Sequence, residues 1–342
     1  MGTADSLTRL RSLGFQEVTA PALSFEQVRL GQDSIQLIGT RAALGTRVSV
    51  SAISDSAEGD AASIAGAFAE LDRLAGLFSR YQSDSALSTL NDAGHLDAPP
   101  PELLRVLERA RYFHALSRGA FDVTVKPVLD LLAARSPATA PSANELRDVA
   151  ALVGAGHLKV KRRTITFARP GMSATLDGIA KGYIVDRMAD VLTCHGIHRF
   201  LIDAGGDIRV RGLKQPGRPW TVAVRDPSTD GVLPDAIPLR EGAVATSGGY
   251  ERFYDAGRRF HHLVSPASGC SPAGTWSVSV IAPNALAADA LATTVFVLGP
   301  DAGMKLLEQL PDCAGMIVTE GGAQRRSRRW HGLSLRQEER IA

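Results

Sequence analysis

Two kinds of hydrophobic periodicity run through this chain, and they predict its secondary structure. In four stretches, apolar side chains return every three or four positions, which is typical of the buried face of a helix. We expect these helices to begin at Asp60 as an N-cap, to run from Pro101 towards Gly119, to end at Gly196, and to cover 285–299.

Strands are expected mainly in the second half of the chain. Short runs there alternate apolar and polar side chains, or stay apolar, between glycine and proline residues. The runs expected to form strands are 46–51, 200–202, 208–210, 221–224, 243–245, 260–264, 276–280 and 316–318, with a hairpin at 157–168. Because strands and helices do not alternate regularly, the pattern favours an α+β fold over a doubly wound α/β fold.

The domain organisation follows from where this periodicity begins and breaks. Residues 1–34 have no sustained period and are expected to form an N-terminal extension, with one domain over 35–335. Several Pro, Ala and Ser residues at 134–147 indicate a surface loop or linker, which would divide the domain into two lobes.

Composition narrows the class of protein. The 342 residues are 44% hydrophobic and 22% charged, which is enough for a large core, and a net charge of +2 gives no case for nucleic acid. The three cysteines are too widely spaced for a disulfide framework or a structural zinc site.

The N-terminal segment bears on where the protein acts. It has no apolar core of signal-peptide length, and we expect no stretch of the chain to be long enough to span a membrane, so the chain as written is expected to be cytoplasmic. An upstream start codon with an export signal would make the protein periplasmic.

Asp289 and Thr293 stand four residues apart in the expected helix 285–299. Their side chains therefore share one helix face, a single turn apart. Mg²⁺ accepts carboxylate and hydroxyl oxygens, and it usually meets proteins through few carboxylates together with substrate phosphates. The spacing thus indicates magnesium-dependent phosphate chemistry.

Glycine-rich turns occur at 178–182, 205–206 and 248–249. Each can bring the backbone close to a phosphate, or can simply form a tight turn. None matches the glycine pattern of a Rossmann dinucleotide site or of a P-loop, which disfavours those two classes of enzyme. Lys181 precedes the helix that ends at Gly196, where it either binds an anion or extends along the surface.

His261 and His262 are neighbours in the expected strand 260–264. Their side chains should therefore face opposite sides. One of them can face a cleft as a general base, and adjacent histidines can equally be packed or exposed.

Taken together, these segments resemble the ApbE family, the FAD:protein FMN transferases. The resemblance follows the family's order from Leu44 to Gly299, about three quarters of the chain. It is carried by LGT (44–46), FSRYQSDSALSTLN (78–91), GAFDVTVKP (119–127), LDGIAKGYIVD (176–186), DAGGDIRVRG (203–212), AVATSGGYERFY (243–254), HHLVSPASGCSP (261–272) and SVSVIAPNALAADALATTVFVLG (277–299).

This resemblance implies a T-fold-like α+β structure with mixed helices and largely antiparallel sheets. It also implies Mg²⁺-dependent cleavage of FAD, transfer of FMN to a Ser or Thr hydroxyl of an acceptor protein, and release of AMP. The family's acceptor pattern, Asp-x-x-[Ser/Thr]-Gly-Ala-[Ser/Thr], does not occur in this chain, so the acceptor is expected to be a separate protein.

Matching the motifs residue by residue assigns roles to individual positions. The base is His262. The expected metal ligands are the carbonyls of Gly178 and Ala292, the carboxylate of Asp289 and the hydroxyl of Thr293. The expected flavin-nucleotide contacts are Leu44, Tyr81, Ala120, Phe121, Asp122, Thr175, Lys181 and Leu263.

Three positions depart from the family's usual wording. Thr175 replaces an acidic residue, Ser265 replaces an aspartate after the histidine, and Leu44 replaces a frequent methionine. Two alternatives therefore stay open beside the transferase, namely a pyrophosphatase that splits FAD into FMN and AMP and a flavin-binding protein without turnover.

Overall fold

A nine-stranded sheet is the centre of the fold in the computed structural model, which describes residues 22–30, 34–54, 57–136, 138–224 and 235–330. Every pair of neighbouring strands in it is antiparallel. In spatial order the strands are β1 (Ser24–Arg29), β2 (Ile35–Ala43), β3 (Thr46–Ser54), β7 (Phe200–Ala204), β8 (Asp207–Arg211), β11 (Glu241–Gly248), β12 (Thr275–Ala282), β13 (Ala314–Thr319) and β14 (Gln324–Arg326).

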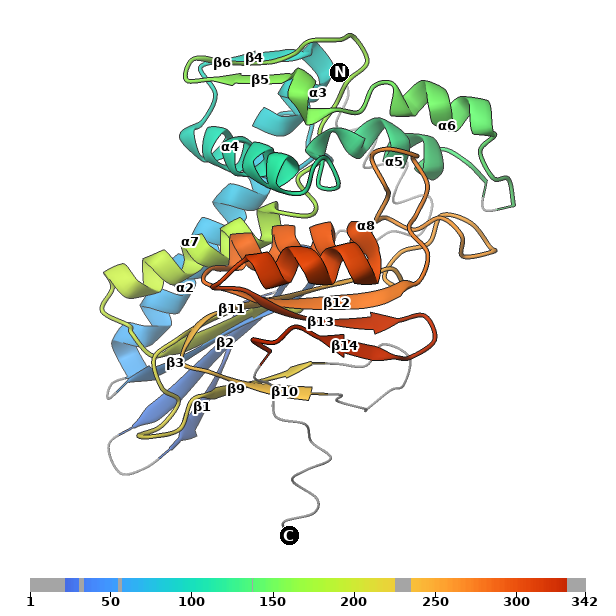
Figure 1. The fold of residues 1–342 in the computed structure, drawn as a ribbon. Coiled ribbons are helices and arrows are strands. Elements are labelled where there is room, and N and C mark those ends of the chain that lie inside the picture. Colours follow the sequence, from blue (N-terminus) through green and yellow to red (C-terminus); the bar gives the residue numbers. More distant parts are fainter. Residues whose placement is uncertain (1–21, 31–33, 55–56, 137, 225–234, 331–342) are drawn as a thin grey trace.

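Three long helices cover one face of this sheet (Figure 1). They are α2 (Ala57–Phe78), α7 (Ala180–Cys194) and α8 (Ala285–Gln309). α7 packs against both α2 and α8, and α8 lies against β11 and β12. The main hydrophobic core lies between these helices and the sheet, with Phe68, Val50 and Phe296 all fully or almost fully buried there.

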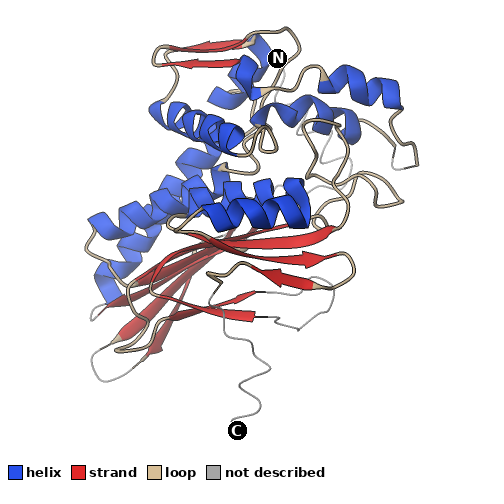
Figure 2. Ribbon diagram, viewed as in Figure 1, coloured by secondary structure: helices blue, strands red, loops and turns tan. Residues whose placement is uncertain are grey.

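The opposite face of the sheet is covered in part by a separate hairpin. It consists of β9 (Trp220–Val224) and β10 (Asp235–Leu239), which pair antiparallel. Trp220 and Ile237 from this hairpin pack with Val210 and Met316 of the main sheet in a second apolar cluster. Helices therefore lie on one side of the sheet and strands on the other (Figure 2).

A smaller, mainly helical part stands beyond the α7–α8 layer (Figure 1). It contains a three-stranded sheet in the order β4 (His95–Asp97), β6 (Thr164–Phe167) and β5 (Leu158–Lys161). Its helices are α3 (Ala86–Ala93), α4 (Pro101–Leu116), η1 (Val123–Val125), α5 (Lys126–Ala133), α6 (Ala143–Ala150) and η2 (Ala155–His157). α4 connects this part to the long helices through its contact with α8.

Close packing of α7 on α8 depends on Gly182. A Cβ atom at this position would lie 2.3 Å from the carbonyl oxygen of Ala285 and 2.9 Å from the Cβ of Asp289. No larger residue fits there unless the two helices move apart. The glycine-rich segment after Gly178 thus lets two helices approach closely, and the contact fixes the position of Asp289.

The expected α+β class with largely antiparallel sheets is confirmed. Several local expectations are wrong. Asp60 lies inside α2 and accepts a hydrogen bond from Ser54 instead of capping the helix. The segment 134–147 is not wholly a loop, because α6 begins at Ala143 with Ser142 and Glu145 forming a capping box. Residues 260–264 form no strand, only an isolated bridge between Phe253 and His261.

Two further expectations concern the chain's ends and its longest helix. Most of the expected extension lies outside the described residues, but β1 falls within it and pairs with β2. By length and composition alone, α8 is an exception to the expectation that no stretch is long enough to span a membrane, because it has 25 residues and contains a sufficiently apolar window. Its apolar window is 61% buried within the fold, as in a helix that packs on a sheet.

Candidate functional site

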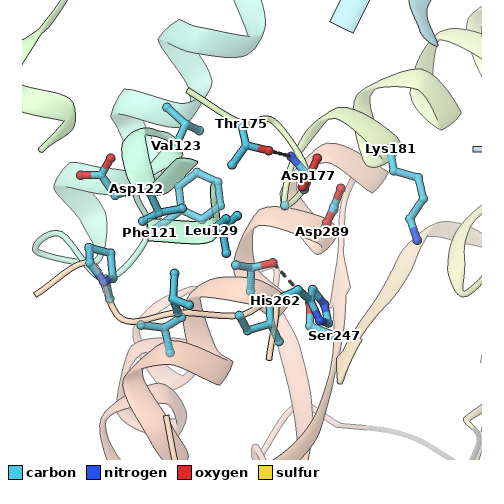
Figure 3. A pocket seen from close by; sticks show the side chains of 18 of the residues that line it. Phe121, Asp122, Val123, Leu129, Thr175, Asp177, Lys181, Ser247, His262 and Asp289 are labelled. Carbon is cyan, nitrogen blue, oxygen red and sulfur yellow. Dashed lines mark hydrogen bonds between the residues drawn. The ribbon is translucent and has the colours of Figure 1, made fainter. Parts of the chain in front are cut away.

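A cavity of about 100 Å³ opens where the small helical part meets the first turns of α7 and the middle of α8. Figure 3 shows Asp177, Lys181, His262 and Asp289 arranged around it, with Phe121 and Leu129 also in its lining. The remaining expected site residues in the lining are Ala120, Asp122, Thr175, Gly178, Leu263 and Thr293. Leu44, Tyr81 and Ala292 are not among the lining residues.

One wall consists of α8 and the loop before α7. Asp289 is 6% exposed, and its Oδ2 accepts the backbone N–H of Gly182 at 3.0 Å, which leaves Oδ1 for another partner. Thr293 follows one turn later, and its hydroxyl lies 3.3 Å from that of Ser247. A Cβ at Gly178 would lie 3.0 Å from the Thr293 hydroxyl, so the backbone of Gly178 closely approaches this oxygen.

Ala292 belongs to the same turn of α8 as Thr293 but is fully buried. Gly178, Asp289 and Thr293 are thus brought together at one wall of the cavity, whereas Ala292 does not line it. Among the residues that the structure describes, no three His, Cys, Asp or Glu side chains gather as a metal site. A metal here would depend on backbone and hydroxyl oxygens beside one carboxylate.

Lys181 supplies positive charge to the cavity. Its Nζ lies 3.5 Å from Oδ2 of Asp207, whose side chain is 3% exposed and whose Oδ2 has no hydrogen-bond partner among the described residues. Burial disfavours the ammonium, but the charges of Asp207, Asp289 and Glu251 outweigh this and raise the pKa of Lys181. The lysine therefore stays charged at neutral pH.

The carboxylates around Lys181 are hard to ionise. Burial raises the pKa of Asp289 well above its usual value, and the neighbouring charge of Asp207 adds to this. Burial also raises the pKa of Asp207, against the opposing effect of Lys181. Two buried carboxyl groups share one ammonium, so a further cation would relieve their repulsion.

His262 and His261 face different surroundings, although they do not lie in the strand that was expected to separate them. His262 lines the cavity, with Nε2 3.8 Å from a carboxylate oxygen of Glu251, and burial lowers the pKa of His262. His261 is turned away, 7% exposed, with its ring edge-on to Phe296 at 5.5 Å between centroids. Both histidines are neutral at pH 7, and only His262 can take a proton within the cavity.

Both carboxylate oxygens of Asp122 already have partners within the protein. One of its oxygens accepts hydrogen bonds from the N–H and hydroxyl of Thr124 at 2.8 and 2.6 Å. The other accepts the N–H of Ala155 at 2.8 Å and lies 3.2 Å from Nδ1 of His114. Burial by itself would raise the pKa of Asp122, but the hydrogen bonds from His114 and Thr124 outweigh it and lower that pKa. A ligand would therefore meet the backbone of this loop.

Thr175 and Tyr81 mark the rim of the site. The Thr175 hydroxyl accepts the N–H of Asp177 at 3.3 Å and so shapes the turn before α7. Asp177 pairs with Arg80 at 2.9 Å, and the Arg80 guanidinium lies over the Tyr81 ring, 4.9 Å from its centroid. Tyr81 is 78% exposed, so its ring is available at the surface next to the cavity.

A larger cavity of about 600 Å³ adjoins the first. Thr246 and Glu251 line both of them. Thr46, Arg47 and the Gly205–Gly206 turn form its far side. Leu44 lies in the two-residue turn before Thr46, with φ of 53°, and packs against the main core. The two cavities together offer room for a dinucleotide, which the first alone does not.

Sequence reasoning missed five polar residues of the first cavity: Asp177, Asp207, Thr246, Ser247 and Glu251. All of them lie within two residues of one of the three glycine-rich turns. The turns were recognised, but the polar side chains next to them were the usable signal.

Comparisons with known proteins show which family this chain is similar to. A family model described as the ApbE family matches residues 44–317. The FAD:protein FMN transferase of Vibrio cholerae is 34% identical over 259 residues, covering 71% of this chain and 77% of that protein. The FAD:protein FMN transferase of Treponema pallidum is 34% identical over 272 residues, covering 71% of this chain and 73% of that protein.

Solved structures show the same fold. The ApbE protein of Thermotoga maritima superposes with a TM-score of 0.77 at 31% identity, covering 89% of this chain and 97% of that one. The flavin transferase ApbE of Vibrio cholerae gives a TM-score of 0.74 at 29% identity, covering 89% and 98%.

Proposed function

Because the chain belongs to the ApbE family, we propose that it transfers FMN from FAD to a Ser or Thr hydroxyl of a separate acceptor protein and releases AMP. The observation that carries this proposal is a single cavity in which Asp289 and Thr293 face Lys181 and His262. A cation site, an anion-binding ammonium and a neutral base are the groups that phosphoryl transfer requires.

We further propose Mg²⁺ as the cation. The lining contains five carboxylates, Asp122, Asp177, Asp207, Glu251 and Asp289, but only one lysine and no arginine. A diphosphate would be repelled by this excess of negative charge unless a divalent cation were present. The carboxylate of Asp289, the hydroxyl of Thr293 and the carbonyls of Gly178 and Ala292 would hold it. When bound, Mg²⁺ neutralises charge that develops on the phosphate oxygens.

The chain's own residues would carry out the other steps. Lys181 binds the phosphate through its ammonium at the first turn of α7. His262 accepts the proton of the acceptor hydroxyl, whose oxygen forms a bond to the phosphorus of the FMN half. The bond from that phosphorus to the bridging oxygen breaks, and AMP leaves with the electron pair.

Mass spectrometry after incubation with FAD, Mg²⁺ and an acceptor-motif peptide tests this proposal. The expected result is a peptide that gains FMN. Free FMN and AMP with an unmodified peptide would indicate a pyrophosphatase, and intact FAD would indicate a flavin-binding protein without turnover. Asp289→Ala should abolish FAD cleavage, while Asp148→Ala, an exposed carboxylate on α6, is the matched control.

A further inference from the structure

A second, arginine-rich cavity of about 440 Å³ lies between α4, α7, β8 and the first turn of α8. It shares no lining residue with the cavity around Asp289. Five arginines line it, Arg105, Arg109, Arg187, Arg209 and Arg211, against two carboxylates, Asp186 and Asp190. The proposed transfer reaction uses none of these side chains.

Both carboxylates already have partners. Asp186 accepts the N–H groups of Ala285 and Leu286 at 2.8 and 2.9 Å, so its charge caps the N-terminus of α8. Arg209 lies 3.8 Å from Asp186 and also donates to Glu241 at 2.8 Å. Asp190 pairs with Arg187 at 2.9 Å, and Arg187 also contacts Glu70.

The other three arginines have no carboxylate partner among the described residues. Arg211 donates to the hydroxyl of Thr193 at 3.0 Å, which is a neutral acceptor. Arg109 lies over the rings of Tyr112 and Phe113, 4.7 and 5.2 Å from their centroids. Arg105 is exposed at the edge of the cavity. The positive charge of these three arginines is therefore not neutralised by carboxylates of the cavity, and it attracts an anion.

Tyr183 adds a neutral donor to this lining. It belongs to α7, and Arg187 and Arg105 are near enough to act on its hydroxyl. Burial outweighs their effect and raises the pKa of Tyr183, so the hydroxyl keeps its proton at neutral pH. Guanidinium groups from a helix and a strand thus stand with a hydroxyl around one space.

We propose that this cavity binds a phosphate monoester in its dianionic form. Planar guanidinium groups match phosphate oxygens in a bidentate manner, and the three arginines without a carboxylate partner supply enough positive charge for a double negative charge. A cavity of this volume accepts a phosphate together with an attached group the size of a nucleoside. The site is independent of the proposed transferase activity, because it shares no residue with that machinery.

Isothermal titration of the full chain with inorganic phosphate and with AMP tests the proposal. Arg105→Met with Arg211→Met should weaken binding of the preferred probe by about tenfold to a hundredfold, the effect of losing charged hydrogen bonds. Arg162→Met with Arg218→Met removes the same charge at exposed positions outside the cavity and should change binding less than about twofold. A larger loss of AMP affinity than of phosphate affinity in the Arg105 and Arg211 variant would show that this cavity also binds the attached nucleoside.

FAD affinity and melting temperature are measured on the same variants. The Arg105 and Arg211 variant should keep both, since neither side chain lines the cavity around Asp289. Equal phosphate affinity in the two double variants, or no binding of either probe to the unaltered chain, would overturn the proposal. An equal loss of FAD and phosphate affinity would also overturn it, because the arginines would then belong to the flavin site.

Discussion

The charge of Lys181 depends on three carboxyl groups near it, one on β8, one on α8 and one in the loop after β11. Its Nζ lies 3.5 Å from Asp207 at the start of β8, and the charges of Asp289 on α8 and of Glu251 also act on it. Lys181→Met should weaken FAD binding by about 1.5–3 kcal/mol, the range for a hydrogen bond to a charged group. Riboflavin has no phosphate and should bind both proteins equally. Isothermal titration with the two ligands measures this. An equal loss of affinity for FAD and riboflavin would mean that Lys181 shapes the pocket and does not contact the phosphate.

Asp207 should act on the nucleotide only through Lys181. Asp207→Asn keeps the shape of the buried side chain but removes the charge that holds the ammonium, so FAD affinity should fall while riboflavin affinity stays unchanged. In a Lys181→Met background the same change should have little further effect, since the group that Asp207 positions is gone. Additive losses in the double variant would mean that Asp207 acts independently of the lysine.

Substitutions of the two adjacent histidines should have different effects, one on activity and the other on stability. His262→Ala should lower turnover by roughly 10²–10⁴-fold, the scale for loss of a general base. His261→Ala should leave turnover nearly unchanged but lower the free energy of unfolding by about 1–3 kcal/mol, because its buried ring packs on Phe296. Single-turnover rates and denaturant unfolding measure the two effects, and similar behaviour of both variants would refute the assignment.

At the scale of elements, the contact between α7 and α8 positions the site. Gly182→Ala would place a methyl group 2.3 Å from the Ala285 carbonyl, so the helices must separate and Asp289 must shift. We expect a loss of about 1–3 kcal/mol in the free energy of unfolding and weaker Mg²⁺ binding. Gly66→Ala on α2 is the matched control, since its new Cβ would meet only Val191 at 3.6 Å. Unfolding in urea should show Gly66→Ala to be neutral or stabilising; equal stability of both variants would contradict the close approach.

Helices and strands were predictable from the sequence where one face of the element is buried along its whole length. The periodicity of α2, α7 and α8 and the alternation of β3 and β12 come from packing on the main core, and the alternation of β9 comes from packing in the second apolar cluster. α6 was missed because only Leu146 is buried among its eight residues, although Ser142 and Glu145 form a capping box that marks its N-terminus. The segment 260–264 has strand-like composition but only one bridging residue, since Ser271 and Arg252 take up its backbone N–H groups.

The candidate site was predictable only in part, for a similar reason. Asp289 and Thr293 are linked by helix geometry, which four residues of sequence are enough to reveal. The approach of Asp207 to Lys181 joins the start of β8 to the start of α7, and the order of strands in the sheet determines it. Local patterns contain no information on such a contact.

At the scale of the whole molecule, the cavity joins the small helical part to the sheet-bound helices, so a bound cation should stabilise the entire fold. Mg²⁺ at 100 times its Kd would add about 2.7 kcal/mol to the free energy of unfolding. Asp289→Ala should lose this gain, whereas the exposed Asp148→Ala should keep it. Melting temperatures with and without Mg²⁺ measure the effect.

The same gain should depend on pH, and the raised pKa of Asp289 gives its sign. Without metal, the folded chain holds this proton more tightly than the unfolded chain, so Asp289 makes the fold less stable as pH rises from the ordinary aspartate value through the raised one. Mg²⁺ must displace that proton, and it then relieves the repulsion from Asp207. The rise in melting temperature on adding Mg²⁺ should therefore be larger at about pH 8 than at about pH 5. A rise that is the same at both, or that persists in Asp289→Ala, would place the cation elsewhere in the molecule.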